Sequence, residues 1–72
     1  MTPAQEIFAQ QIALGRTKAD AYRAAYPKAR KWKKSSVYAD ASRLAAKREI
    51  AERIQKLQAE LWQQQMRMTI RR

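Results

Sequence analysis

Residues 26–36 read Tyr-Pro-Lys-Ala-Arg-Lys-Trp-Lys-Lys-Ser-Ser, and this stretch separates two predicted helices. Pro27 disfavours helical geometry in the residue before it, so the preceding helix ends there. Ser35 or Ser36 is a suitable N-cap for the next helix. Between these signals, Lys28–Lys34 carries five positive charges around one tryptophan. The stretch therefore predicts a basic loop beside the N-terminus of a helix.

Two helices precede this loop, and each has its own start signal. Thr2 can cap the first helix, Pro3 suits its first position, and Gln5 completes a capping box. Gly15, the only glycine in the chain, ends this helix as a left-handed cap. Thr17 is the expected cap of the second helix. The signals predict two short helices that follow each other closely.

Two further helices follow the loop. The first carries a narrow apolar stripe of Val37, Ala41 and Leu44, and the second begins near Lys47 or Arg48. Because no glycine or proline separates them, the two helices can also form one bent helix. The predicted core consists of apolar residues at helical spacing: Ile7, Phe8, Ile12, Tyr22, Val37, Ala41 and Leu44.

These elements place the chain in the all-α class, since no alternating apolar pattern supports a strand. We expect a helix-turn-helix-like three-helix unit over residues 1–46 that forms the DNA-binding domain. A longer C-terminal helix over residues 47–72 follows, leads to an oligomerisation region beyond this chain and ends in a frayed basic tail. A chain of 72 residues allows one small domain.

The C-terminal helix carries a second pattern. Ile50, Ile54, Leu57 and Leu61 are spaced 4, 3 and 4 residues apart, as in a coiled-coil seam. We expect this seam to mediate self-association in the full-length protein. Packing against the chain's own helices is an equally good interpretation of two heptads, and the sequence leaves both open.

Charge restricts the classes of function. The chain has 16 lysines and arginines against 6 acids, a net charge of +10, and neither histidine nor cysteine. A domain this basic is drawn to nucleic acid or to an anionic membrane. No apolar run approaches the ~20 residues that span a bilayer, so we expect no membrane segment. Without histidine, cysteine, a metal-ligand pattern or a glycine-rich phosphate loop, we expect no enzyme and no cofactor.

The basic loop and the helix after it supply the candidate DNA-binding residues. Loop cations would hold phosphates while the next helix presents small and hydrogen-bonding side chains to a groove. Trp32 either stacks on DNA or covers the edge of a small core. An ordinary solvated charge run is the alternative for the loop. The candidate residues are Lys28, Arg30, Lys31, Lys33, Lys34, Ser35, Ser36, Ser42 and Arg43.

The order of these motifs resembles the N-terminal DNA-binding region of bacteriophage small terminase subunits. Residues 2–8 look like that family's opening Thr-Pro-x-Gln-x-x-Phe, and residues 21–27 (Ala-Tyr-Arg-Ala-Ala-Tyr-Pro) are similar to its second helix. Residues 41–44 (Ala-Ser-Arg-Leu), followed by Arg53-Ile54, match its third helix and the start of its fourth. Between those helices the family usually has Asn-Pro or Asp-Asp, whereas residues 45–48 are Ala-Ala-Lys-Arg here.

The resemblance implies a role in viral genome packaging. Such subunits recognise the packaging site on double-stranded DNA, form rings, and present DNA to the large terminase subunit in the host bacterial cytoplasm. Because family members are usually longer, the contact with the large subunit is expected in regions absent from this chain.

Three other functions compete with this one. The strongest alternative is a small helix-turn-helix transcriptional regulator that dimerises through its C-terminal helix. A membrane-active basic helix fits less well, because the apolar face of the C-terminal helix is narrow. RNA binding lacks the aromatic sheet platform that common RNA-binding modules use.

Overall fold

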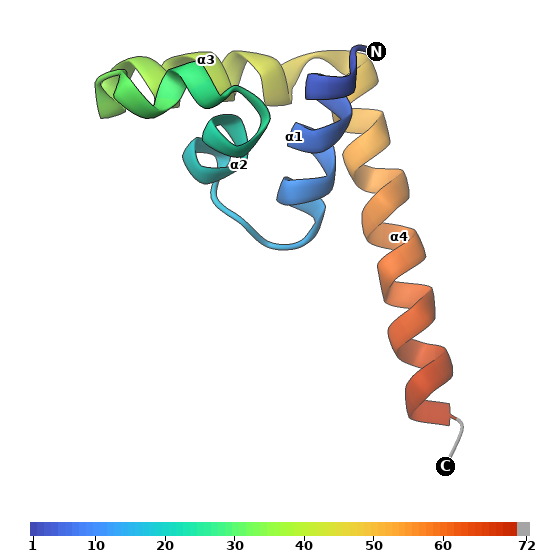
Figure 1. Cartoon of the computed structure of the whole chain (residues 1–72). Helices are drawn as coiled ribbons and strands as arrows, with labels where there is room; N and C mark the ends of the chain where they lie inside the picture. Colours follow the sequence, from blue (N-terminus) through green and yellow to red (C-terminus); the bar gives the residue numbers. More distant parts are fainter. Residues whose placement is uncertain (71–72) are drawn as a thin grey trace.

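The computed structural model describes the backbone of residues 1–70 and the side chains of residues 1–65. Every regular element in this part of the chain is helical, which confirms the all-α prediction. The elements are α1 (Pro3–Ala13), α2 (Lys18–Ala25), the 3-10 helix η1 (Pro27–Lys31), α3 (Lys34–Ala46) and α4 (Arg48–Ile70). The first three α-helices cross one another, and the longer α4 runs away from them (Figure 1). The tail predicted to fray, residues 66–72, continues α4 as helix up to Ile70, and residues 71–72 lie outside the described part.

The predicted end signals of α1 and α2 are confirmed. The hydroxyl of Thr2 accepts a hydrogen bond from the backbone N–H of Gln5 at 3.2 Å, and the Gln5 side chain accepts one from the Thr2 N–H at 3.0 Å. Gly15 has φ 97°, a left-handed conformation that side chains rarely adopt. The Thr17 hydroxyl accepts a hydrogen bond from the Asp20 N–H at 3.1 Å. Hydrogen bonds and backbone preferences of neighbouring residues therefore determine where α1 begins and ends and where α2 begins.

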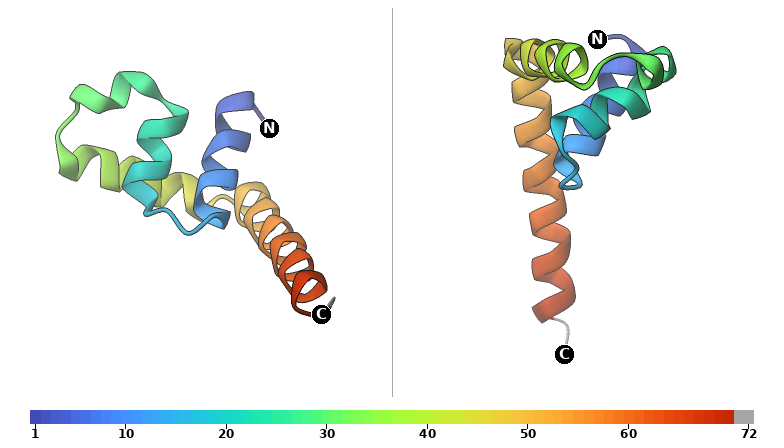
Figure 2. Two further views of the ribbon diagram at one scale, coloured as in Figure 1. Left: turned by 60° about the horizontal axis from the view of Figure 1, so that its bottom comes forward. Right: turned by 90° about the vertical axis from the view of Figure 1, so that its left-hand side faces the viewer.

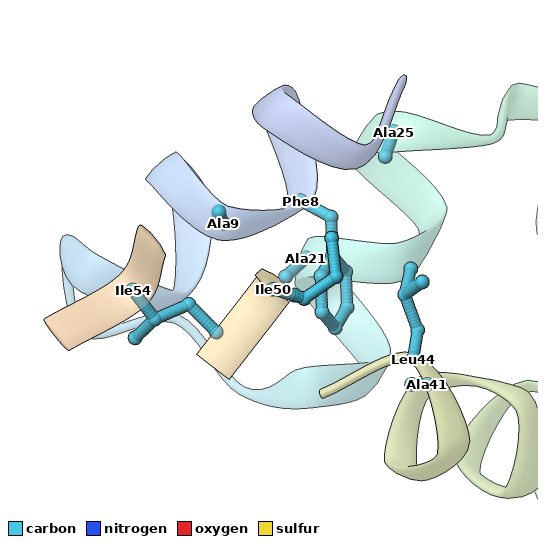
Figure 3. Close-up of a cluster of buried hydrophobic side chains, with 8 residues drawn as sticks. All are labelled: Phe8, Ala9, Ala21, Ala25, Ala41, Leu44, Ile50 and Ile54. Atoms are coloured by element: carbon cyan, nitrogen blue, oxygen red, sulfur yellow. The ribbon is translucent and has the colours of Figure 1, made fainter. Parts of the chain in front are cut away.

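The core forms where α1, α2, α3 and the start of α4 meet. Phe8 is fully buried and lies between Ala21, Leu44 and Ile50 (Figure 3). The small alanines of α2 allow α1 and α3 each to pack closely against α2. Each buried large side chain contributes about 1.5–3 kcal/mol relative to exposure. The buried cluster consists of Phe8, Ala9, Ala21, Ala25, Ala41, Leu44, Ile50 and Ile54.

Most of the predicted core is confirmed, with one error. Val37 is fully buried, and Ile12 and Tyr22 are partly buried against the cluster. Ile7 was also expected in the core, but it is 41% exposed. Consecutive helical residues point about 100° apart, so when Phe8 faces the core Ile7 falls at the edge of the buried face.

Helices α3 and α4 are separate, because the helix breaks at Lys47. Lys47 is extended, with φ −63° and ψ 135°, and α4 turns sharply away from α3 (Figure 1). The apolar stripe explains the break. On one straight helix Leu44 and Ile50 would point about 120° apart. Both are buried in the same core, so the chain must turn between them.

The first half of α4 belongs to the core. Ile50 is fully buried and Ile54 is 9% exposed, and both pack in the cluster with α1. The compact unit expected to end at residue 46 therefore includes the beginning of α4. The molecule measures 47 × 22 × 18 Å, because the rest of α4 projects from this unit.

Candidate nucleic-acid interface

The first part of the basic loop is a short 3-10 helix, η1, rather than an irregular segment, and Lys34 at its end already belongs to α3. Pro27 occupies the first turn of η1, and the N–H of Ala29 donates to the carbonyl of Tyr26 at 2.9 Å. Ala29 is fully buried and fixes η1 to the body of the protein. With this residue inside, the cations around it are exposed: Lys28, Arg30, Lys31, Lys33 and Lys34.

These five loop cations have no internal counterion. Within residues 1–65, none of them forms an ion pair with an acidic side chain. The nearest acids in the sequence are Asp20 and Asp40, which lie outside the loop. Together, η1 and the start of α3 form the end of the molecule farthest from the projecting part of α4 (Figure 2). The loop cations are therefore free to meet an external anion.

Helix α3 begins earlier than expected. Ser35 and Ser36 do not cap it, because Lys33 is the N-cap residue and the helix starts at Lys34. The reason is geometric: Trp32 and Lys33 are extended after η1, so the chain enters α3 before it reaches the serines. No described side chain caps the first turn. Its backbone N–H groups add partial positive charge beside the loop cations.

The predicted groove-facing residues of α3 differ in exposure. Ser35 and Ser36 are exposed in the first turn, and the Arg43 side chain is 82% exposed. Ser42 is half-buried and lines a pocket with Ala46, so it is less exposed than the sequence suggested. Of the predicted groove-facing residues of α3, those in the first turn and Arg43 are therefore the ones open to solvent.

Arg43 has one weak internal partner. Its Nη1 lies 3.6 Å from Oδ1 of Asp40, one turn earlier on the same helix. Exposed pairs of this kind contribute about 0–1 kcal/mol, so a phosphate or a base can replace the carboxylate. Asp40 also affects Tyr22, whose pKa is raised first by burial and then by the nearby Asp40 charge. Asp40 therefore keeps Arg43 close to the protein surface, and Arg43 can still leave this weak ion pair to contact another anion.

A row of aromatic rings connects the loop with the core. Phe8 meets Tyr22 edge to face at 6.3 Å between ring centroids, and Tyr22 lies 4.6 Å from Tyr26. Trp32 lies 6.3 Å from Tyr22 at an interplanar angle of 42°. Trp32 nevertheless remains 44% exposed. It covers the edge of the core on one side and faces solvent with the rest of its surface.

An ion pair that the sequence analysis missed joins α1 to α4. Nε and Nη2 of Arg53 donate to the two carboxylate oxygens of Glu6, each at 2.9 Å. Gln10 donates to the same carboxylate at 2.8 Å. These hydrogen bonds, that of Arg53 first, lower the pKa of Glu6. The pair is 47 residues apart in sequence, so no local spacing could indicate it.

The proposed oligomerisation seam is divided by the fold. Ile50 and Ile54 are buried inside the chain, so the assignment of all four seam residues to a partner is corrected. Leu57 and Leu61 are half-buried, Leu57 against the core cluster, and Leu14 and Trp62 beside them are 63% and 62% exposed. Two adjoining pockets of about 210 and 270 Å³ are lined in common by Ala13, Leu14 and Leu61. Any partner of α4 would meet this second half of the seam.

The described residues contain no cluster of three or more acidic, histidine or cysteine side chains that could hold a metal ion. Among the same residues, no helix has the length and apolar character needed to cross a membrane. Comparisons of this chain with protein-family models, with curated proteins and with solved structures find no match.

Proposed function

We propose that this protein binds double-stranded DNA through η1 and the first turn of α3. The observation that carries the proposal is the group of five exposed loop cations without an acidic partner in residues 1–65, next to the uncapped start of α3. Each DNA phosphate contacted by lysine or arginine releases counterions, which favours binding. A helix start beside these cations adds backbone N–H donors for phosphate oxygens.

The arrangement of α2, η1 and α3 suits a helix-turn-helix mode of binding. In this mode α3 enters the major groove by its N-terminal end, and the loop cations fix its position on the backbone. Arg43 lies on the outer face of α3, where an arginine can form two hydrogen bonds with guanine. η1 makes the turn longer than the 3–4 residues of the tight motif.

The biological role that fits best is recognition of the packaging site by a bacteriophage small terminase subunit. This part of the proposal rests on the motif resemblance over roughly residues 2–57. It implies a homo-oligomer, a large terminase subunit as partner, and work in the host bacterial cytoplasm. The exposed Leu14 and Trp62, with the half-buried Leu57 and Leu61, are the surface that supports self-association.

The same apolar surface supports a second candidate, a transcriptional regulator that dimerises through α4. The two functions differ in assembly and in the DNA site. A dimeric regulator binds two half-sites related by two-fold symmetry, about one helical turn apart. A terminase domain binds as a monomer or as part of a larger ring.

Light scattering with a pool of random duplexes tests both candidates. We expect the chain to be monomeric alone and to gain the mass of a duplex at low salt. Selection from the pool should then give a site without two-fold symmetry. A dimer on a palindromic site would favour the regulator, and no mass change at low salt would contradict DNA binding itself.

A further inference from the structure

Exposure increases along the aromatic row from the core to the loop. Phe8 is fully buried, Tyr22 and Tyr26 are partly buried, and Trp32 is 44% exposed. A tryptophan that only closed the edge of the core would be covered like the two tyrosines. Trp32 instead keeps a large part of its apolar surface in solvent, within the run of loop cations.

The backbone that carries this indole is held by the structure around it. The backbone N–H of Trp32 donates to the carbonyl of the buried Ala29 at 3.1 Å, and the indole lies beside Tyr22, with 6.3 Å between the ring centroids. Tyr22 therefore limits the orientations open to the ring before a partner binds. Preorganised aromatic surfaces bind flat partners at a low entropic cost.

The charges around Trp32 identify the partner. Lys31 and Lys33 flank it directly in the sequence, and the other loop cations complete the group. A fixed aromatic ring among cations is the combination that binds the bases and backbone of unpaired nucleic acid. An intact duplex hides its base faces in the stack, so only an unpaired or unstacked base can reach the indole.

We infer that Trp32 stacks on an unpaired or unstacked base, so that the protein prefers DNA with a locally opened base step. This inference rests on the proposed DNA binding and names the form of DNA that the same surface selects. The loop cations hold the phosphates on either side of the opened step, and α3 contacts the adjoining duplex.

The test compares two 20-base-pair duplexes, one fully matched and one with a single central unpaired base. The whole chain should bind the second duplex more tightly. Stacking on one base is worth about 5- to 160-fold in affinity. Trp32→Leu should remove this preference, whereas Trp32→Phe, which keeps a ring against Tyr22, should retain part of it. Trp62→Phe, the matched control on exposed α4, should leave it unchanged.

The Trp62→Phe variant also gives a direct signal, because Trp32 is then the only indole. Its fluorescence should be quenched by the duplex with the unpaired base and much less by the matched one. Stacking would be overturned, with DNA binding intact, if the parent chain bound both duplexes with equal affinity. The same holds if Trp32→Leu weakened binding to both duplexes equally and the fluorescence showed no selective quenching. Failure of the parent chain to bind either duplex would overturn both proposals.

Discussion

The junction of α1 with α4 and the end formed by η1 and α3 both carry arginine and lysine, but they use them differently. At the junction, Arg53 donates two hydrogen bonds to Glu6 and so joins α4 to α1. At the other end, the loop cations have no acidic partner within residues 1–65. A paired cation orients a helix, whereas an unpaired cluster adds repulsion to the fold unless an external anion meets it. The comparison separates cations that are paired within the fold from cations that are left for an external anion.

Phe8→Ala should have the largest effect, because Phe8 packs in the core that supports both regions. Removal of a buried phenylalanine typically costs about 3–5 kcal/mol, a large part of the stability of a small domain. We expect loss of cooperative thermal unfolding and loss of DNA binding together. Ile7→Ala, on the same helix at 41% exposure, is the matched control and should change the melting temperature little. Equal effects of the two changes would mean that Phe8 is not central.

Alanine substitutions along α4 should show that its first half stabilises the core more than its second half. Ile50 is fully buried and Leu61 is half-buried. Ile50→Ala should lower the free energy of unfolding by about 2–5 kcal/mol, and Leu61→Ala should lower it much less. Chemical denaturation measures both. A large loss of stability in Leu61→Ala would place the second half of the seam inside the monomer.

Arg43 is intermediate between the paired Arg53 and the unpaired loop cations, because it has only a weak partner. Arg43→Ala tests whether it contacts a base or a phosphate. If Arg43 contacts a base, the difference in binding free energy between specific and random DNA should fall by about 1–3 kcal/mol. Asp40→Asn, which releases Arg43, should keep this difference and strengthen binding to both duplexes. Titrations with the selected site and with random DNA measure the change. An equal loss on both duplexes would assign Arg43 to the phosphate backbone.

The junction pair predicts a smaller, pH-dependent effect. The pKa of Glu6 is lowered by its bonds to Arg53 and Gln10, so the pair stabilises the fold above the ordinary glutamate pKa. That stabilisation should be lost as the pH falls through the lowered pKa of Glu6. Melting temperatures from pH 7 to pH 3 should therefore fall more in the parent chain than in Glu6→Gln. Glu52→Gln, an exposed acid on α4, should behave like the parent. Identical pH profiles for the parent and Glu6→Gln would contradict the structural role of the pair.

The sequence predicted the features that depend on neighbouring residues. The caps at Thr2 and Thr17, the left-handed Gly15 and the end of α2 before Pro27 are all present as expected. Each arises from chemistry within a few residues, so a single stretch of sequence contains the necessary information.

Features that depend on distant contacts were missed or left open. The seam of α4 has the same spacing whether a partner or α1 covers it, so burial of Ile50 and Ile54 could not be read from the pattern. The break at Lys47 has no glycine or proline, although the change of apolar face between Leu44 and Ile50 does indicate it. The start of α3 at Lys34 follows from the geometry of η1, and the run of lysines and arginines gave no sign of a 3-10 helix there.

The salt dependence of duplex binding tests the central claim, that the unpaired loop cations hold DNA phosphates. Each phosphate contact adds about 0.9 to the slope of log affinity against log salt. Replacement of both Lys31 and Lys34 by alanine should therefore flatten the slope by roughly 2. The double variant Arg16→Ala and Lys56→Ala removes the same charge from exposed positions outside the loop and should leave the slope unchanged. Equal flattening by both variants, or an unchanged slope without Lys31 and Lys34, would contradict the account.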